Sequence, residues 1–192
     1  MSQLTAAEVC AGYDGLGMAV KKVFNARTLW VSEYDEAPSR ILAHHYPDIP
    51  NYGDMTKIDW AAVPKVDIVS GGTPCQDLSH AGRRAGMVDG TRSNLAVEYL
   101  RAVEIIKPKY AIWENVRGAY SANADSGLES CPGCLGEVGG AGEPPLRALG
   151  RLLGNFSDLG YDCQWRGLRA ADVGAPHGRF RVFVLARRRD DS

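Results

Sequence analysis

The sequence predicts an α/β fold: an open, mostly parallel sheet with helices on both faces. Short apolar runs typical of buried strands alternate along the chain with stretches of helical periodicity. Glycine-rich turns join several of these runs, as they do in parallel sheets. The length of 192 residues is enough for one domain with a hydrophobic core. We therefore expect a single domain over residues 1–192.

The composition excludes a strongly basic protein. Hydrophobic residues make up 45% of the chain, charged residues 23%, and the net charge is −1, so a nucleic-acid role requires local arginines. The cysteines number five, and residues 1–5 carry no signal-peptide pattern. No apolar run is long enough to span a membrane. We therefore expect an intracellular, cytoplasmic protein in a reducing compartment.

The first elements have the pattern of a nucleotide-binding turn. A strand is predicted over 8–11, a glycine-rich turn over 12–17, and then a helix that ends at Phe24. This order is typical of the opening of a Rossmann-like sheet. The apolar residues that share one helical face are Leu16, Ala19, Val20, Val23 and Phe24.

A second strand, over 28–33, ends in an acid. Glu33 lies about 20 residues beyond Gly12, where an acidic side chain binds ribose hydroxyls in such folds. Asp54 follows a later glycine and is placed to face the same ligand. We expect both acids to hold the nucleoside part of a cofactor, although Glu33 also suits a solvated carboxylate at a strand end.

The remaining elements follow the same alternation. Helices are predicted over 35–46, with Asp35 as cap, over 94–107, and over 146–159. Strands are predicted over 66–69 and 110–113 and on either side of 170–176.

A cysteine stands at the end of the strand over 66–69. Gly71 and Gly72 allow a sharp turn, and Pro74 fixes the backbone just before Cys75. Open α/β sheets build their sites at this edge, which favours a functional thiol over a structural one. The polar stretch over 77–93 that follows carries several arginines and is long enough for a functional loop.

Other reactive side chains are expected at the same edge. Glu114 ends the strand over 110–113, and Arg179 and Arg181 share a face of the last strand by the two-residue period. A thiolate, a carboxylic acid and a guanidinium suit covalent attack on a polar, planar heterocycle. A phosphatase-type cysteine needs an arginine six residues on, where Ala81 stands.

Residues 117–145 form a glycine-rich insertion with few large apolar side chains. Cys131 and Cys134 have the spacing of half a zinc site, but two ligands are too few to close one. The insertion leaves the sheet just after Glu114, so we expect it at the active-site edge, either as a disordered segment or in contact with the substrate.

Four motifs in this order resemble the cytosine-5 DNA methyltransferase family. Residues 71–76 match its catalytic Pro-Cys motif, and residues 114–116 match its Glu-Asn-Val motif. Residues 175–181 are similar to its Pro-Gln-x-Arg-x-Arg motif, and residues 10–15 to its glycine-rich cofactor loop.

The resemblance implies a Rossmann-like methyltransferase fold, S-adenosylmethionine as cofactor and double-stranded DNA as partner. Cys75 would attack a flipped cytosine, Glu114 would contact its ring nitrogen, and Arg181 its carbonyl oxygen, with Arg179 beside it. The implied cofactor residues are Cys10, Ala11, Gly12, Tyr13, Gly15, Glu33, Tyr34, Asp54, Met55, Pro74 and Leu95. The implied DNA contacts are Gln76, Ser79, Arg83, Arg84 and Arg92.

The sequence departs from the family pattern in three ways. Asp14 replaces a glycine of the cofactor loop, and His177 replaces a glutamine. The target-recognition region and last motif are not recognisable after Arg181. Such a chain would be weakly active, would need a second subunit for recognition, or would use the insertion over 117–145 for it. Two alternatives therefore stay open: a non-catalytic nucleic-acid-binding relative, and an enzyme that acts on RNA or free nucleotides. The small size would suit a phage or bacterial genome.

Overall fold

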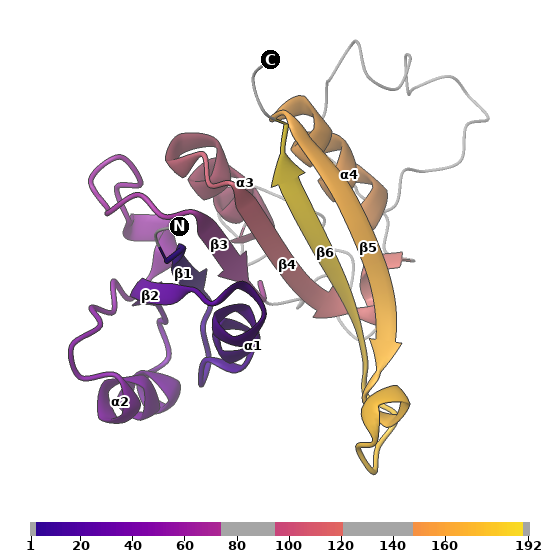
Figure 1. Ribbon diagram of the computed structural model, residues 1–192, viewed down its shortest axis with the longest axis horizontal. Coiled ribbons are helices and arrows are strands. Elements are labelled where there is room, and N and C mark those ends of the chain that lie inside the picture. Colours follow the sequence, from indigo (N-terminus) through magenta and orange to yellow (C-terminus); the bar gives the residue numbers. More distant parts are fainter. Residues whose placement is uncertain (1–2, 74–94, 121–147, 190–192) are drawn as a thin grey trace.

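The computed structural model describes residues 3–73, 95–120 and 148–189, which form a six-stranded sheet in the order β2-β1-β3-β4-β6-β5 (Figure 1). The strands are β1 Thr5–Val9, β2 Arg27–Ser32, β3 Ile68–Gly71, β4 Tyr110–Val116, β5 Tyr161–Arg169 and β6 Phe180–Arg188. The α-helices are α1 Gly15–Phe24, α2 Glu36–His45, α3 Leu95–Ile106 and α4 Ala148–Asp158. Short 3₁₀ helices are η1 Met55–Lys57, η3 Arg117–Tyr120 and η4 Ala170–Val173.

Strand directions confirm a mostly parallel sheet. β1 pairs in parallel with β2 and β3, and β3 pairs in parallel with β4. β6 lies antiparallel between β4 and β5, so among the described strands it alone runs against the rest. The chain leaves β1 for β2 on one side and returns to β3 on the other. This reversal creates a switch point at the carboxyl ends of β1 and β3, where open α/β sheets bind ligands.

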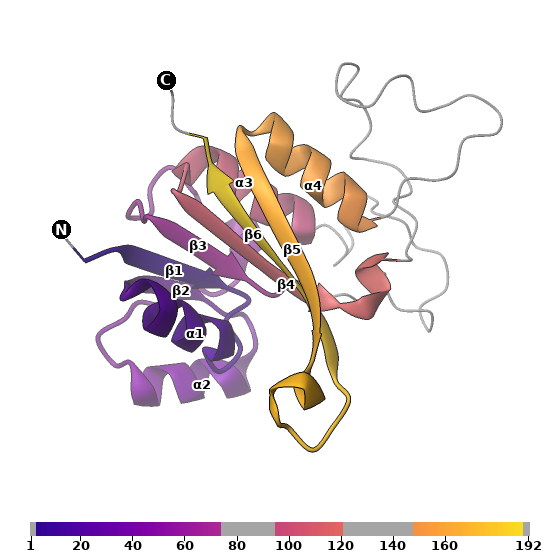
Figure 2. The same ribbon diagram turned by 45° about the vertical axis from the view of Figure 1, so that its right-hand side comes forward.

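Helices cover both faces of the sheet, as predicted. Successive strand residues point to opposite faces, so neighbours in one strand belong to different cores. Ala6 and Ile68 pack with Val20 of α1 on one face. Val69 packs with Val103 of α3, and Phe156 of α4 belongs to the same core on the other face. Figure 2 shows α1 and α2 on one side of the sheet and α3 and α4 on the other.

Four predicted strand ranges differ from the structure. β2 covers Arg27–Ser32, so Glu33 lies just after it, and β4 continues to Val116, so Glu114 lies inside it. β1 ends at Val9 and not at residue 11, because Cys10 has a φ of 50° in the left-handed region, which ends the extended run. β3 begins at Ile68 and not at residue 66, because Asp67 turns its carboxylate to the Thr5 amide and hydroxyl. β3 also ends at Gly71 and not at residue 69, so the turn that leads to Cys75 begins two residues later than expected.

The helix predictions were correct in position and partly wrong in detail. In α1, Val20 is buried and Leu16 and Phe24 are half-buried, but Ala19 and Val23 are exposed. Residues four apart make the sheet-facing row, and the two exposed residues lie on its outer side. Asp35 stands at the N-cap of α2 as predicted, but its side chain makes no capping hydrogen bond.

β5 and β6 form a long hairpin that extends past the other strands, with η4 near its tip (Figure 1). This hairpin confirms the two strands predicted around 170–176. Most of the predicted insertion lies outside the described residues; its first residues form η3. Within the described part of the chain, no helix has the length and apolar character needed to cross a membrane.

Candidate active site

The switch point is tightly packed where β3 ends. Val9 is in register with Gly71, and Gly71 with Trp113 of β4. A side-chain carbon at Gly71 would lie 2.6 Å from Val9 Cγ2, so the position tolerates only glycine. The carboxyl ends of β1 and β3 therefore lie together beside the middle of β4, just before the predicted nucleophile.

Thr73 is held by two side chains from β4. Trp113 Nε1 donates to Thr73 Oγ1 at 3.0 Å, and Asn115 Nδ2 donates to the Thr73 carbonyl at 3.2 Å. All three residues are buried. These bonds fix the backbone two residues before Cys75, which itself lies outside the described residues. We did not predict this role for Asn115 or Trp113, although Asn115 belongs to the matched Glu-Asn-Val motif.

Glu114 and Arg181, which were expected at one edge of the sheet, form an ion pair. They come from adjacent strands, and Arg181 Nε lies 2.7 Å from Glu114 Oε1. A side-chain carbon at Gly72 would lie 3.0 Å from Glu114 Oε2, so the other carboxylate oxygen faces the turn that leads to Cys75. The Glu114 and Arg181 side chains are 25% and 21% exposed, which leaves both reachable from solvent.

The prediction that Arg179 shares a strand face with Arg181 was wrong. β6 begins at Phe180, so Arg179 lies before the strand and the two-residue period does not reach it. Its carbonyl accepts from the Ala170 amide and closes the hairpin turn, while the residue is exposed. The structure thus brings one of the two arginines to Glu114.

The glycine-rich turn after β1 is tied to Glu33. Gly12 N donates to Glu33 Oε2 at 2.7 Å, and Asp35 N donates to Oε1 at 2.8 Å. Gly12 has a φ of 55°, a conformation that suits glycine. Glu33 is buried, and its backbone amide donates a hydrogen bond to Asn51 Oδ1. The predicted proximity of the turn and this acid is therefore present.

The other predicted cofactor residues surround this turn in different ways. Tyr13 and Tyr34 are exposed, whereas Met55 is buried against Cys10, whose Sγ lies 3.5 Å from Met55 Sδ. Asp54 caps η1 by accepting from the Thr56 amide. Of the remaining members, Ala11 is buried, Gly15 begins α1 and Leu95 begins α3, while Pro74 lies outside the described residues.

Neither cysteine in the described residues is suited to act as a nucleophile. Burial, with the nearby charges of Glu33 and Glu8, raises the pKa of the Cys10 thiol to about 12. Burial, with Asp162 beside it, raises the pKa of Cys163 to about 11. Both thiols stay protonated at neutral pH, and thiolate chemistry must come from elsewhere. Cys75, Cys131 and Cys134, and the predicted DNA contacts from Gln76 to Arg92, lie outside the described residues.

Two buried acids were missed as site residues. Glu8 and Asp14 are almost fully buried beneath the glycine-rich turn. Asp14 was noted only as a departure from the family's glycine. A charged residue inside a glycine-rich turn is the signal that could have identified it, because buried carboxylates need partners.

This arrangement defines a class of protein. A glycine-rich turn joined to an acid at the next strand, beside a carboxylate–guanidinium pair at the switch point, is typical of an α/β enzyme with a nucleoside-containing cofactor. A family model described as C-5 cytosine-specific DNA methylase matches residues 4–192. The chain belongs to this family.

Relatives agree on methyl transfer. The chain is 31% identical over 193 residues to the type II methyltransferase M.NlaIV of Neisseria lactamica, covering 96% of this chain and 41% of the relative. It is 30% identical over 229 residues to a protein of Escherichia phage P1 named DNA N-6-adenine-methyltransferase, covering 100% of this chain and 29% of the relative.

The fold is also that of solved methyltransferases. The S. pombe Dnmt2 methyltransferase superimposes with a TM-score of 0.71 at 16% identity, covering 100% of this chain and 51% of that chain. At this identity the likeness concerns the fold alone. The chain spans about two-fifths of M.NlaIV and about half of the solved structure.

Proposed function

We propose that this protein is a DNA cytosine-5 methyltransferase, which transfers a methyl group from S-adenosylmethionine to carbon 5 of cytosine. The observation that carries the proposal is the Glu114–Arg181 pair, which faces Gly72 three residues before Cys75. Family membership supports the same chemistry. The name of the phage P1 relative refers to adenine and not to cytosine, so the test of the proposal has to identify the base that is methylated.

The residues at the ends of β1 and β2 fit S-adenosylmethionine. Each Glu33 oxygen accepts one backbone N–H, which leaves lone pairs for the ribose hydroxyls. A side-chain carbon at Gly12 or Gly53 would meet nothing within 4 Å, so a ligand can approach both backbones. The exposed Tyr13 and Tyr34 rings offer apolar surface for a base. When bound, this cofactor supplies an electrophilic methyl group. The other cofactor residues in this assignment are Cys10, Ala11, Gly15, Asp54, Met55, Pro74 and Leu95.

Cys75 supplies the nucleophile in this proposal. Its thiolate adds to carbon 6 of the cytosine ring, and the electron pair of the carbon 5–carbon 6 bond becomes available at carbon 5 for the methyl group. The proton on carbon 5 then leaves, the sulfur–carbon bond breaks, and the thiolate is regenerated. The Thr73 tethers fix the backbone that leads to this thiol.

Glu114 and Arg181 bind the edge of the base. Glu114 Oε1 is held by Arg181 Nε, so Oε2 is left for the ring nitrogen, where it holds a proton during addition. Arg181 Nη1 donates to the Phe180 carbonyl at 2.8 Å, so Nη2 is left for the exocyclic oxygen. Both contacts withdraw electrons from the ring and favour attack at carbon 6.

The substrate in this proposal is duplex DNA whose cytosine leaves the stack, at a cost of about a few kcal/mol. We assign phosphate and base contacts to Gln76, Ser79, Arg83, Arg84 and Arg92, and a DNA-facing role to the insertion over 117–145. A second subunit that supplies sequence recognition is part of this proposal.

The test is transfer of a labelled methyl group to duplex DNA, RNA and free nucleotides, followed by nucleoside analysis. The proposal expects label in 5-methylcytosine from DNA, and none with Cys75→Ser. Label in N6-methyladenine would contradict it. Label only in RNA or free nucleotides would show that the substrate is not DNA and would favour that alternative. DNA binding without transfer, under conditions in which the cofactor binds, would favour the non-catalytic alternative.

A further inference from the structure

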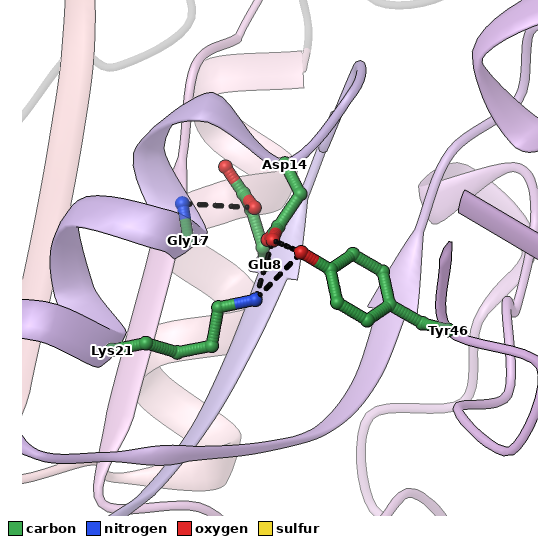
Figure 3. A network of polar contacts seen from close by, with 5 residues as sticks. All are labelled: Glu8, Asp14, Gly17, Lys21 and Tyr46. Carbon is green, nitrogen blue, oxygen red and sulfur yellow. Dashed lines mark hydrogen bonds and ion pairs between the residues drawn. The ribbon is translucent and has the colours of Figure 1, made fainter. Parts of the chain in front are cut away.

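Two acidic side chains lie buried beneath the glycine-rich turn. Glu8 is the second-last residue of β1, and Asp14 is the residue just before α1; they are 3% and 1% exposed. Figure 3 shows both beside the first turns of α1, with Lys21 and Tyr46 converging on Asp14. Buried charges are costly without partners, so the contacts of this pair need to be accounted for.

Asp14 joins three parts of the chain through one oxygen. Its Oδ2 accepts from Lys21 Nζ of α1 at 2.6 Å and from the Tyr46 hydroxyl, just after α2, at 2.6 Å. Lys21 Nζ also lies 2.9 Å from the Tyr46 hydroxyl and 4.2 Å from its ring centre. The turn, α1 and the end of α2 are therefore connected by one carboxylate.

Glu8 supplies the remaining partner. Its Oε2 accepts from the Gly17 amide at 3.1 Å. Burial, then the hydrogen bond with Asp14 and its charge, raises the pKa of Glu8 to about 9. This pKa favours the protonated Glu8 carboxyl group at physiological pH. Asp14 Oδ1 is buried and has no hydrogen-bond partner among the described residues, and a proton on the adjacent Glu8 carboxyl group would give it one.

Gly17 allows the two carboxyl groups to meet. A side-chain carbon at this position would overlap Asp14 Oδ1 and Glu8 Oε2. The two acids thus face the same point on α1, and a residue larger than glycine at position 17 would push their carboxyl groups away from the helix.

The backbone of the turn depends on this packing. Cys10, Gly12 and Asp14 all have positive φ, and Asp14 is at 72°. Aspartate adopts this conformation more readily than most residues, yet at a cost relative to glycine. The Asp14 amide donates to the Ala11 carbonyl at 2.8 Å, which closes the turn. Side-chain contacts of Asp14 offset the cost and fix the turn.

We propose that the side chains of Glu8, Asp14, Lys21 and Tyr46 form a clamp that holds residues 10–14 in the cofactor-binding conformation. These four residues are positioning residues, because they act through the backbone of the turn. The inference rests on the proposed function in one respect, which is that the turn binds S-adenosylmethionine. It gives Asp14 a reason to stand where the family has a glycine.

The clamp makes cofactor binding sensitive to alkaline pH. The ionisable groups that face Glu8 are Asp14 and Lys21, and Tyr46 lies on the far side of Asp14. Above about pH 9, Glu8 ionises beside the Asp14 carboxylate. The single Lys21 charge then faces two carboxylates, and the repulsion opens the turn. Below that pH the clamp stays closed.

The experiment compares Glu8→Gln, Lys21→Met and Tyr46→Phe with wild type. Glutamine keeps an N–H donor for Asp14 and an oxygen for Gly17 but cannot ionise. Binding of S-adenosylhomocysteine, measured by calorimetry, should weaken about 10-fold in Lys21→Met and less in Tyr46→Phe. Glu8→Gln should bind as wild type does at pH 7.5 and keep its affinity at pH 9.5, where wild type loses about 3-fold, close to the limit that one group with a pKa of about 9 can produce at that pH. Asp67→Asn, at the amino-terminal ends of β1 and β3 and so away from the turn, is the control for general destabilisation.

A second measurement follows the turn without ligand. Amide hydrogen exchange over 10–17 should be faster in Lys21→Met than in wild type, and unchanged in Asp67→Asn. Between pH 7.5 and 9.5, exchange corrected for intrinsic rates should accelerate in wild type and not in Glu8→Gln. Equal alkaline loss in wild type and Glu8→Gln, or unchanged exchange in Lys21→Met, would overturn the clamp. Wild type that binds no S-adenosylhomocysteine would instead contradict the proposed function, while hydrogen exchange would still decide on the clamp.

Discussion

The two halves of the candidate site treat charge in opposite ways. At the glycine-rich turn, Glu8, Asp14 and Glu33 are buried, and each accepts at least one hydrogen bond from a backbone amide, Lys21 or Tyr46. At the base-binding side, Glu114 and Arg181 bind each other and keep a fifth to a quarter of their side-chain surface exposed.

This difference matches two kinds of ligand. A cofactor pocket that is filled in every cycle benefits from a turn whose shape is fixed in advance, because little ordering then remains for binding. A base that must leave the DNA stack needs polar groups that it can reach and that keep unused donors and acceptors. The comparison predicts that variants at the base-binding side alter catalysis, whereas variants at the turn alter cofactor affinity and its pH dependence.

The largest effect is expected from the arginine that meets Glu114. Arg181→Met should lower kcat/KM for methyl transfer by about 10²–10³-fold, since it removes a donor to the developing charge on the ring. Arg179→Met should lower it far less, because Arg179 lies outside the strand and is exposed. Steady-state kinetics on both variants, with circular dichroism to check folding, decide the point. Equal losses would mean that the two arginines share the role.

A smaller effect is expected at Glu33. Glu33→Gln should weaken binding of S-adenosylmethionine by on the order of 1–3 kcal/mol, because an amide cannot accept from two backbone N–H groups and the ribose as a carboxylate does. Calorimetry measures the change, and Glu36→Gln, in the exposed first turn of α2, is the matched control. An unchanged affinity would leave Glu33 with the structural role of tying Gly12 and Asp35.

The smallest effect concerns stability and pH. The pKa of Glu8 is raised from 4.5 to about 9 in the folded protein, so between these values the native state holds a proton that the unfolded chain has lost. The free energy of unfolding of wild type therefore falls as pH rises through this window. Glu8→Gln has no carboxyl group here to lose a proton. The free energy of unfolding of Glu8→Gln relative to that of wild type should therefore rise by on the order of 1–3 kcal/mol between pH 5.5 and 8.5.

Urea unfolding at several pH values measures that advantage. Hydrogen bonds from the Thr5 amide and hydroxyl lower the pKa of Asp67, so its contribution is lost only as pH falls below the usual carboxyl range. Asp67→Asn should therefore run parallel to wild type over the same window. A Glu8→Gln curve that is also parallel to wild type would mean that Glu8 carries no proton in the folded state.

The sequence was sufficient to predict the features that follow from local periodicity and residue spacing. Alternating strands and helices predicted the layered sheet, and the spacing from Gly12 to Glu33 predicted that the turn and this acid serve one ligand site, where the structure joins them by a hydrogen bond of 2.7 Å. It placed Arg179 wrongly, because the two-residue period holds only inside a strand and β6 begins one residue later. It could not find the contact between Glu8 and Asp14, because that contact depends on three left-handed residues that fold the turn back over β1.

The central claim, that Cys75 forms a bond to the base, has a direct test. DNA in which 5-fluorocytosine replaces cytosine throughout presents every target sequence, and fluorine cannot leave carbon 5 as a proton does. With S-adenosylmethionine present, wild type should form a complex that survives denaturation and that mass spectrometry maps to Cys75, and Cys75→Ser should form none. Wild type that methylates ordinary cytosine but gives no such complex, or a Cys75→Ser variant that still gives one, would contradict the account.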